Sequence, residues 1–312
     1  MGIFVYLEFD SGRQNRIRRL AGRDDVHFCR PGTSFEVVKE TFLSSRIIFG
    51  NPPRHWLAQC RALQWLQLDS TGFGEYEALA WDHVENREQP VVCNLSGFYA
   101  EPVAETCLAG ILSLMRGIDQ CVDLKARRHW RGHAIRPGLR LLANAAVVFF
   151  GFGAINRRLA EILQPFGCRI RSFGRNWDAV ALDRALEGAD VVVCVAPHTS
   201  STSGVFDRDR LARIPSSAIL VNAGRGSLLD EAALAERLHA GDLAGAVIDV
   251  TATEPLPREH AFWSCPNLLL TQHSAGGCED ELDRKIDYFE SNLHRFNSAE
   301  PVKGIVRLSR GY

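Results

Sequence analysis

Short apolar runs alternate with amphipathic stretches from about residue 144 to residue 275. The runs are rich in β-branched and aromatic residues, and apolar positions recur at helical spacing in several of the gaps between them. Near-continuous apolar strands joined by helices are typical of a parallel sheet that is covered on both faces. The predicted strands lie at 145–150, 168–173, 190–196, 218–222, 245–250 and 267–271.

The stretch 228–241, LLDEAALAERLHAG, shows how one of the helices is delimited. Asp230 is a typical N-cap residue, and Gly241 is a typical residue just beyond the last turn. We therefore expect a helix between these two positions. Six strands connected in this way predict a doubly wound dinucleotide-binding domain of the Rossmann type.

The first 95 residues predict a second α/β unit. A long helix over 101–122 would connect it to the first sheet, and the helical tail after Asp280 would return to it. We expect this smaller unit to comprise 1–97 and 284–312, and the dinucleotide-binding domain to comprise 98–283. The candidate strands of the smaller unit lie at 3–9, 26–29, 46–50, 63–69 and 90–95.

Charge and cysteine usage exclude several classes of protein. The formal net charge is -1, so nothing in the overall charge points to nucleic acid or an anionic membrane. No apolar run reaches the length of a membrane span, and the first residues lack the pattern of a signal peptide. The nine cysteines contain no C-x-x-C pair, which favours reduced thiols in a cytoplasmic protein. His129 and His133 have the spacing of a metal pair but no nearby acidic or cysteine partner, so we expect no metal.

The segment VVFFGFGAINRRLAEIL nearly spells the dinucleotide fingerprint G-x-G-x-x-G. Gly151 and Gly153 occupy the two positions that serve the phosphates, whereas Asn156 occupies the third, which concerns packing of the helix. Ala154 and Ile155 would begin a helix whose N–H groups can bind an anion. We expect a working site in which Asn156 loosens or shifts the helix slightly.

The end of the second strand bears on the choice of cofactor. An acidic residue there would hold the ribose hydroxyls of NAD, but this chain has Gly174 and Arg175. A guanidinium suits the 2′-phosphate of NADP, so NADP is expected to be preferred, with NAD possible. The alternative is that Arg175 is one more surface arginine.

Polar residues follow the later strands at the edge of the sheet where ligands bind. Reduction of a keto acid needs a carboxylate anchor, a proton donor and a group that keeps the donor protonated. Arg225 suits the first role, His273 the second and Glu254 the third. No phosphate loop or nucleophile elbow is present, which leaves NTPase and hydrolase hypotheses without their motifs.

These segments resemble the D-isomer-specific 2-hydroxyacid dehydrogenase family, most specifically in VNAGRGSLLDEAALAERLHAGDLAGAVIDVTATEPLP and NLLLTQHSAGG. The resemblance implies a flavodoxin-like substrate domain beside the Rossmann domain, a site in the cleft between them, and a homodimer formed largely through the cofactor domain. It places the catalytic roles on Arg225, Glu254 and His273. It also implies cofactor contacts at Pro197, Thr202, Ala223 and Asp249, and substrate contacts at Thr71, Gly72 and Phe73, where Phe73 would influence the width of the pocket.

The resemblance implies a reductase of small 2-keto acids such as glyoxylate or hydroxypyruvate, acting reversibly on the D-2-hydroxy acid. Gln272 and Thr251 depart from the family pattern, which usually has proline and an aromatic residue at these positions, and make the substrate less predictable. A different class of function also stays open: a dinucleotide-sensing binding protein, similar to a corepressor, with vestigial catalysis. Asn156 and the unusual residues around His273 would favour that alternative.

Overall fold

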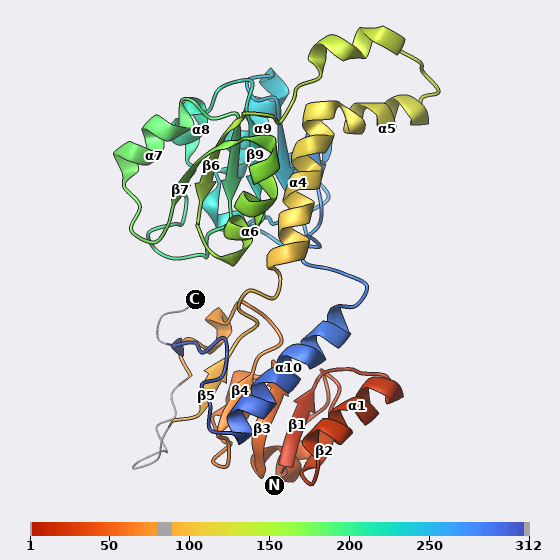
Figure 1. Cartoon of the computed structure of the whole chain (residues 1–312), viewed down its shortest axis with the longest axis vertical. Coiled ribbons are helices and arrows are strands. Elements are labelled where there is room, and N and C mark those ends of the chain that lie inside the picture. Colours follow the sequence, from red (N-terminus) through yellow and green to blue (C-terminus); the bar gives the residue numbers. More distant parts are fainter. Residues whose placement is uncertain (1, 80–88, 309–312) are drawn as a thin grey trace. The chain divides into compact units, whose positions relative to one another are not determined.

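The computed structural model describes residues 2–79 and 89–308. Residues 1, 80–88 and 309–312, all of which belong to the smaller unit expected from the sequence, lie outside the described residues. The chain divides into two compact units, which are described one at a time (Figure 1). The first unit comprises 1–98 and 278–312, and the second comprises 99–277.

The first unit is built on a parallel sheet with the strand order β2-β1-β3-β4-β5. This is the order of a flavodoxin-like domain, which confirms the expected fold class. Its strands are β1 (Gly2–Tyr6), β2 (Asp25–Phe28), β3 (Ser45–Gly50), β4 (Trp65–Gln67) and β5 (Val91–Cys93). Its helices are α1 (Ser11–Ala21), α2 (Phe35–Leu43), α3 (Arg54–Leu57), the 3-10 turn η1 (Gly74–Tyr76) and α10 (Glu281–Asn297).

Alternate residues of these strands enter two separate cores, one on each face of the sheet. Phe4, Ile48 and Leu66 pack with α2 and α3 on one face. The neighbouring strand positions pack with α1 and α10 on the other. On this second face Phe289 of α10 stacks on Phe49, with ring centroids 4.5 Å apart. The core of the first unit therefore needs residues from both ends of the chain.

Ion pairs on the surface of the first unit join helix α1 to helix α10. Arg13 donates to Asp283, with an Nη2–Oδ2 distance of 2.6 Å, and Arg16 contacts both Asp287 and Glu290. Asp10 caps α1 by accepting from the backbone N–H of Arg13. Two helices that are far apart in the sequence are thereby fastened side by side.

The second unit is built on a six-stranded parallel sheet with the order β11-β10-β9-β8-β6-β7. Its strands are β6 (Ala146–Phe150), β7 (Arg169–Phe173), β8 (Val191–Cys194), β9 (Ile219–Asn222), β10 (Gly245–Ile248) and β11 (Leu268–Leu270). Each predicted strand contains one of these. The helices are α4 (Ala100–Arg116), α5 (Ile118–Ala126), α6 (Ala154–Leu163), α7 (Ala179–Leu186), α8 (Arg208–Arg213) and α9 (Glu231–Ala240). The 3-10 turns are η2 (Gly132–Gly138), η3 (Gln164–Phe166), η4 (Gly226–Leu228) and η5 (Ala261–Ser264).

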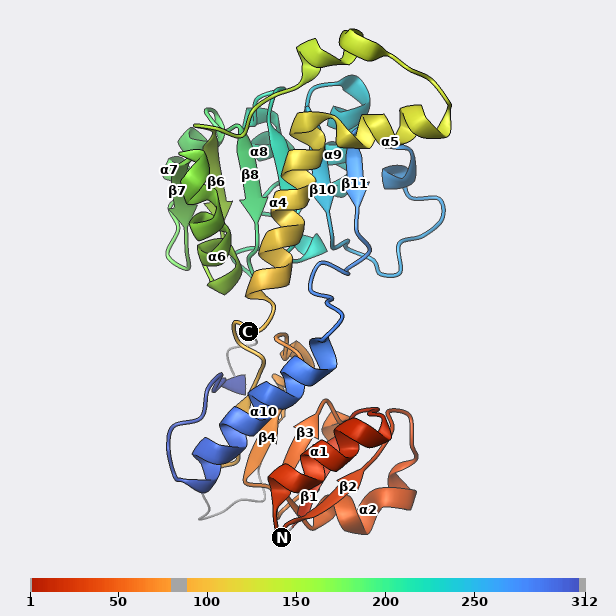
Figure 2. The same ribbon diagram turned by 45° about the vertical axis from the view of Figure 1, so that its right-hand side comes forward.

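Helices cover both faces of this sheet, as the near-continuous apolar strands predicted (Figure 2). Val147, Val191 and Val247 point to the face covered by α4 and α6. Val148, Val192 and Ile248 point to the face covered by α7, α8 and α9. The expected N-cap and stop of α9 are confirmed, because Asp230 accepts from the N–H of Ala233 and Gly241 has a φ of 74°.

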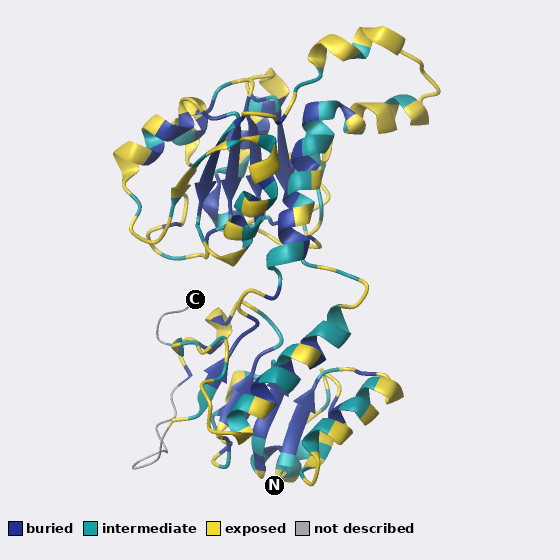
Figure 3. Cartoon of the chain, in the orientation of Figure 1, coloured by how far each residue is buried: buried dark blue, intermediate teal, exposed yellow. Residues whose placement is uncertain are grey.

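The single helix expected over 101–122 is wrong. Gly117 adopts a left-handed conformation with a φ of 63°, which ends α4 and begins α5 in a new direction. A Cβ at this position would lie 2.9 Å from Cδ2 of Leu139. Helix α5 and the turn η2 form an arm whose residues are mostly exposed, and α5 has no buried residue (Figure 3).

Candidate active site

The sheet of the second unit changes winding direction between β6 and β8, and this is where open α/β sheets bind ligands. The loops that follow these two strands touch each other at Gly151. A Cβ there would lie 2.3 Å from the carbonyl oxygen of Val195, and the φ of Gly151 is 85°. Only glycine fits this position, for both steric and conformational reasons.

The first turn of α6 fits a pyrophosphate. Gly153 is its N-cap and offers no side chain to the N–H groups of that turn, to which Ala154 and Ile155 belong. Helix N-termini bind anions through such N–H groups and the helix dipole. A Cβ at Gly153 would meet nothing within 4 Å, so a ligand can approach the backbone closely.

Asn156 bonds to the glycine turn through its side chain. Its side chain is fully buried, and Nδ2 donates to the carbonyl oxygen of Gly151 over 2.6 Å. Oδ1 is buried in the described structure without a hydrogen-bond partner. A hydrogen bond thus ties the helix to the turn at a position where the fingerprint has glycine, which has no side chain.

Three further segments line the same edge of the sheet. Gly174 and Arg175 follow β7; both are exposed, and a Cβ at Gly174 would meet nothing within 4 Å. After β8, Thr202 Oγ1 accepts from Thr199 N at 2.9 Å and donates to Pro197 O at 2.7 Å, which builds a closed turn. Ala223 follows β9, and its N–H donates to the carbonyl of Cys194 in β8.

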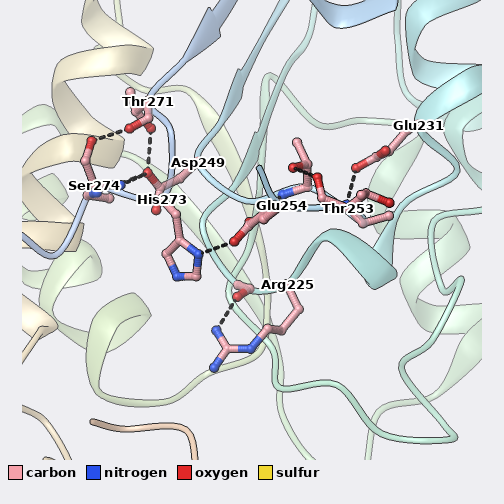
Figure 4. Close-up of polar contacts among 12 residues, drawn as sticks. Arg225, Glu231, Asp249, Thr253, Glu254, Thr271, His273 and Ser274 are labelled. Atoms are coloured by element: carbon pink, nitrogen blue, oxygen red, sulfur yellow. Dashed lines mark hydrogen bonds and ion pairs between the residues drawn. The ribbon is translucent and has the colours of Figure 1, made fainter. Parts of the chain in front are cut away.

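His273 and Glu254 form the most direct polar contact of the site. The two residues follow β11 and β10, and Nδ1 of His273 lies 2.7 Å from Oε2 of Glu254 (Figure 4). Since a carboxylate accepts hydrogen bonds, this contact places a proton on Nδ1 and leaves Nε2 facing away from Glu254. His273 is 55% exposed, so the second nitrogen can meet a ligand.

Burial raises the pKa of Glu254, but opposing effects outweigh it. Hydrogen bonds from His273 and from the backbone N–H of Thr251, together with the positive charges of His273 and Arg225, lower the pKa of Glu254 below its usual value. The carboxylate is therefore ionised at neutral pH. An ionised carboxylate is a strong acceptor for the N–H on Nδ1 and fixes the orientation of the imidazole.

Asp249 holds the segment that carries His273. It is buried at the end of β10, and its Oδ1 accepts from Thr271 Oγ1 at 2.7 Å, from Ser274 N at 2.9 Å and from Ala275 N at 3.0 Å. The carbonyl of Asp249 also accepts from the N–H of His273 itself. These bonds support the left-handed conformation of His273, whose φ is 56°.

Arg225 lies on the turn after β9 with an exposed side chain. It donates one of its five N–H groups to the carbonyl of Gly224 over 2.6 Å. Asn222, which the sequence reasoning missed, is fully buried and shapes this turn, because Nδ2 donates to Arg225 O and Oδ1 accepts from Gly224 N. The available signal was a polar residue at the end of the apolar strand ILVN.

The first unit holds the remaining predicted residues on one braced loop. Ser70 Oγ donates to Gly72 O at 2.7 Å, and Asn94 Nδ2 donates to Thr71 O at 2.7 Å. The ring of Phe73 is only 2% exposed and packs into the core of its own unit. The ring therefore fills the core of its own unit, and the expected influence of Phe73 on the width of a pocket stays a prediction.

Within residues 2–79 and 89–308, no group of three His, Cys, Asp or Glu side chains is arranged to hold a metal ion. No helix among those residues is long and apolar enough to cross a membrane.

A glycine turn at the switch point of a parallel sheet, together with a His–Glu pair at the same edge, defines a dinucleotide-dependent oxidoreductase. The family model described as "D-isomer specific 2-hydroxyacid dehydrogenase, NAD binding domain" matches residues 108–275. The chain belongs to the D-isomer-specific 2-hydroxyacid dehydrogenase family and is an NAD(P)-dependent oxidoreductase. The alternative of a dinucleotide-sensing binding protein is not favoured.

Relatives and solved structures agree with this assignment. Glyoxylate/hydroxypyruvate reductase A of Klebsiella pneumoniae (strain 342) is 30% identical over 67% of this chain and 68% of its own length. A D-isomer-specific 2-hydroxyacid dehydrogenase family protein from Aeromonas salmonicida has the same fold, with a TM-score of 0.81, 24% identity and coverage of 98% and 99%. A dehydrogenase of this family from Xanthobacter autotrophicus Py2, solved with NADPH and MES, gives a TM-score of 0.79 at 25% identity, with coverage of 100% and 99%.

Proposed function

We propose that this protein is an NADP-preferring reductase of small 2-keto acids, with Arg225, Glu254 and His273 as its catalytic residues. The observation that carries the proposal is the 2.7 Å contact between His273 Nδ1 and Glu254 Oε2. It couples a proton donor to an ionised carboxylate at the edge of the sheet where the glycine turn lies. The substrate class is supported by the similarity to glyoxylate/hydroxypyruvate reductase A.

Each of the three residues has a distinct task in this mechanism. A dihydronicotinamide cofactor, when bound, would supply the hydride for reduction of the keto acid at its carbonyl carbon. His273 donates the proton on Nε2 to the carbonyl oxygen, and Glu254 stabilises the imidazolium through Nδ1. Arg225 binds the substrate carboxylate through its exposed guanidinium.

Other segments complete the proposed binding of cofactor and substrate. Gly151, Gly153, Ala154 and Ile155 would hold the pyrophosphate at the start of α6. The turn with Pro197 and Thr202, together with Ala223 and Asp249, would flank the rest of the dinucleotide. In the first unit, the backbone of Thr71, Gly72 and Phe73 would meet the substrate carboxylate.

The first experiment is to measure oxidation of NADPH and NADH with glyoxylate, hydroxypyruvate, pyruvate and bulkier 2-keto acids. We expect faster turnover with NADPH and with the short acids.

Removing the imidazole in His273→Ala should lower kcat by about 10²- to 10⁴-fold, because proton transfer is lost. The exposed His55→Ala serves as a control outside the site. Undiminished turnover in His273→Ala would remove the proposed proton donor.

A second experiment tests the cofactor preference at the end of β7. Gly174→Asp adds a carboxylate where a Cβ has open space, so folding should be unaffected. The new charge would repel a 2′-phosphate, and the ratio of kcat/KM for NADPH to that for NADH should fall by about tenfold or more. An unchanged ratio would show that this position does not contact the 2′-phosphate.

A further inference from the structure

Glu231 is the first residue of α9, and each oxygen of its carboxylate makes a polar contact. Oε1 accepts from the backbone N–H of Ala252 at 2.7 Å, and Oε2 lies 3.3 Å from Nε2 of His260. The Glu231 side chain is only 13% exposed. Ala252 and His260 lie near the two ends of the segment that follows β10, so one carboxylate contacts this segment twice.

The ring of His260 is oriented by a hydrogen bond on its other nitrogen. Its Nδ1 accepts from the backbone N–H of Phe262 at 3.2 Å. A ring nitrogen that accepts carries no proton, so the proton of the neutral ring lies on Nε2, the nitrogen 3.3 Å from Glu231 Oε2. Glu231 thus accepts one hydrogen bond, from Ala252, and lies beside the protonated nitrogen of His260.

The segment held in this way carries Glu254. Thr251 N donates to Glu254 Oε1 at 3.0 Å, and Thr251 Oγ1 donates to Thr253 O at 2.9 Å (Figure 4). Ala252, the residue fixed by Glu231, lies between these two bonded residues. A shift of Ala252 would consequently move the carboxylate that contacts His273.

The same helix start is linked to the turn that carries Arg225. A Cβ at Gly226 would lie 2.0 Å from the carbonyl carbon of Thr251 and 2.2 Å from the nitrogen of Ala252, so the two segments are in backbone contact. Glu231 lies five residues after Gly226 and bonds back to Ala252. Its carboxylate thus fastens the Glu254 segment against the Arg225 turn.

We infer that Glu231 is a positioning residue, which acts through Ala252 to set the place of Glu254 beside His273. The inference rests on the proposed function, because it assigns Glu231 a part in that reaction. Glu231 itself touches neither His273 nor Arg225 by a hydrogen bond between described residues, and it is not a catalytic residue.

A purely structural role makes the opposite prediction for two conservative variants. If Glu231 only placed a negative charge at the start of α9, Glu231→Asp would preserve its effect and Glu231→Gln would not. If it positions Ala252, Gln keeps an acceptor of the right length, whereas Asp is shorter by one methylene and loses the bond. The two roles therefore predict opposite orders for the activities of Glu231→Asp and Glu231→Gln.

The kinetic test compares kcat on the best keto acid with the dissociation constant for NADPH, measured by fluorescence. Glu231→Asp should lower kcat by about 10- to 100-fold and leave NADPH binding within about twofold, because a misplaced catalytic group affects the reaction step. Glu231→Gln should stay within about fivefold of the unmodified protein. Glu236→Gln, on the exposed side of the same helix, is the matched control and should change neither quantity. If Glu231→Asp is not recovered folded, Glu231→Ala replaces it and should fall below Glu231→Gln.

A double variant tests whether Glu231 acts through Glu254. Once Glu254→Gln has removed the carboxylate, adding Glu231→Asp should lower kcat by less than about threefold. Full additivity of the two losses, or a Glu231→Asp protein with normal kcat, would overturn the inference.

Hydrogen exchange supplies a readout that does not depend on turnover. Peptides covering 250–256 should exchange faster in Glu231→Asp than in Glu231→Gln, with the unmodified protein slowest. Equal exchange in all three would overturn the inference even in an active enzyme. The unmodified protein could instead show this order of exchange but no turnover. That result would refute the proposed function, while the hold of Glu231 on Ala252 would stand.

Discussion

Asn156 is the residue at which this chain departs most clearly from the dinucleotide fingerprint. Its buried amide donates to Gly151 at the turn proposed to hold the pyrophosphate. Asn156→Asp would replace that donor by an acceptor and add a negative charge beside an anion. We expect affinity for NADPH to fall by about tenfold or more, measured by fluorescence titration.

The control for this variant is Asn297→Asp, which makes the same change of charge at an exposed position of the first unit. It should bind NADPH as the unmodified protein does. Equal affinity in Asn156→Asp would mean that the start of α6 does not hold the phosphates.

The location of a single residue could be predicted where it follows directly from the strand that the residue comes after. His273 and Glu254 follow neighbouring parallel strands, whose carboxyl ends meet at one edge, and their contact follows from that. The bonds of Asn156, Asn222 and Glu231 depend on rotamers and on backbone carried by other elements, which spacing does not encode. Phe73 shows the same limit, because spacing alone does not indicate that its ring packs into the core of its own unit.

At the scale of elements, the pairs between α1 and α10 give the first unit a dependence on pH. A hydrogen bond and the charge of Arg13 outweigh desolvation and lower the pKa of Asp283 below its ordinary value of 3.8. The unfolded chain therefore binds the proton more readily than the folded one. The stabilisation is present above the unfolded pKa and is lost as pH falls through the lowered folded pKa.

Arg13→Gln should accordingly speed hydrogen exchange of peptides covering 11–21 at neutral pH. The variant and the unmodified protein should also differ in free energy of unfolding. This difference should shrink as the pH falls toward and below 3.8. Arg19→Gln, at the exposed end of the same helix, is the control and should have little effect at either pH. A difference that persists in acid would assign the effect of Arg13 to packing.

The elements were largely predictable because each strand is an uninterrupted apolar run and α9 carries clear boundary residues. The break at Gly117 was not, since an isolated glycine inside a helical pattern costs only about 1 kcal/mol and does not by itself end a helix. What ends α4 is a left-handed residue packed against Leu139, a contact made by a segment that lies beyond α5. The strand order of the second sheet likewise depends on which strands pair, and the apolar runs do not specify the pairs.

At the scale of the whole molecule, the exposed arm of the second unit supports the proposal of a homodimer. Val122 and Trp130 on this arm are 65% and 93% exposed, so a partner that covers the arm would remove two large apolar side chains from water. We expect the unmodified protein to have the mass of a dimer by light scattering after gel filtration. Val122→Asp combined with Trp130→Asp should give a monomer, because two charges would enter an apolar contact.

Val180→Asp is the matched control, since Val180 is also exposed but lies on α7, away from the arm. It should leave the dimer intact. A monomeric unmodified protein, or a dimer that survives both arm substitutions, would contradict the proposal.

The discontinuity of the first unit has a consequence for how the chain matures during synthesis. Phe289, Ile286 and Leu293 of α10 complete a core whose other members come from the first hundred residues. The second unit is continuous over 99–277, so all of its residues are translated before α10. Domains usually fold in the order of their synthesis, N-terminal first. In this chain the order is reversed: the segment translated first must wait, with one face of its sheet uncovered, until the last helix emerges.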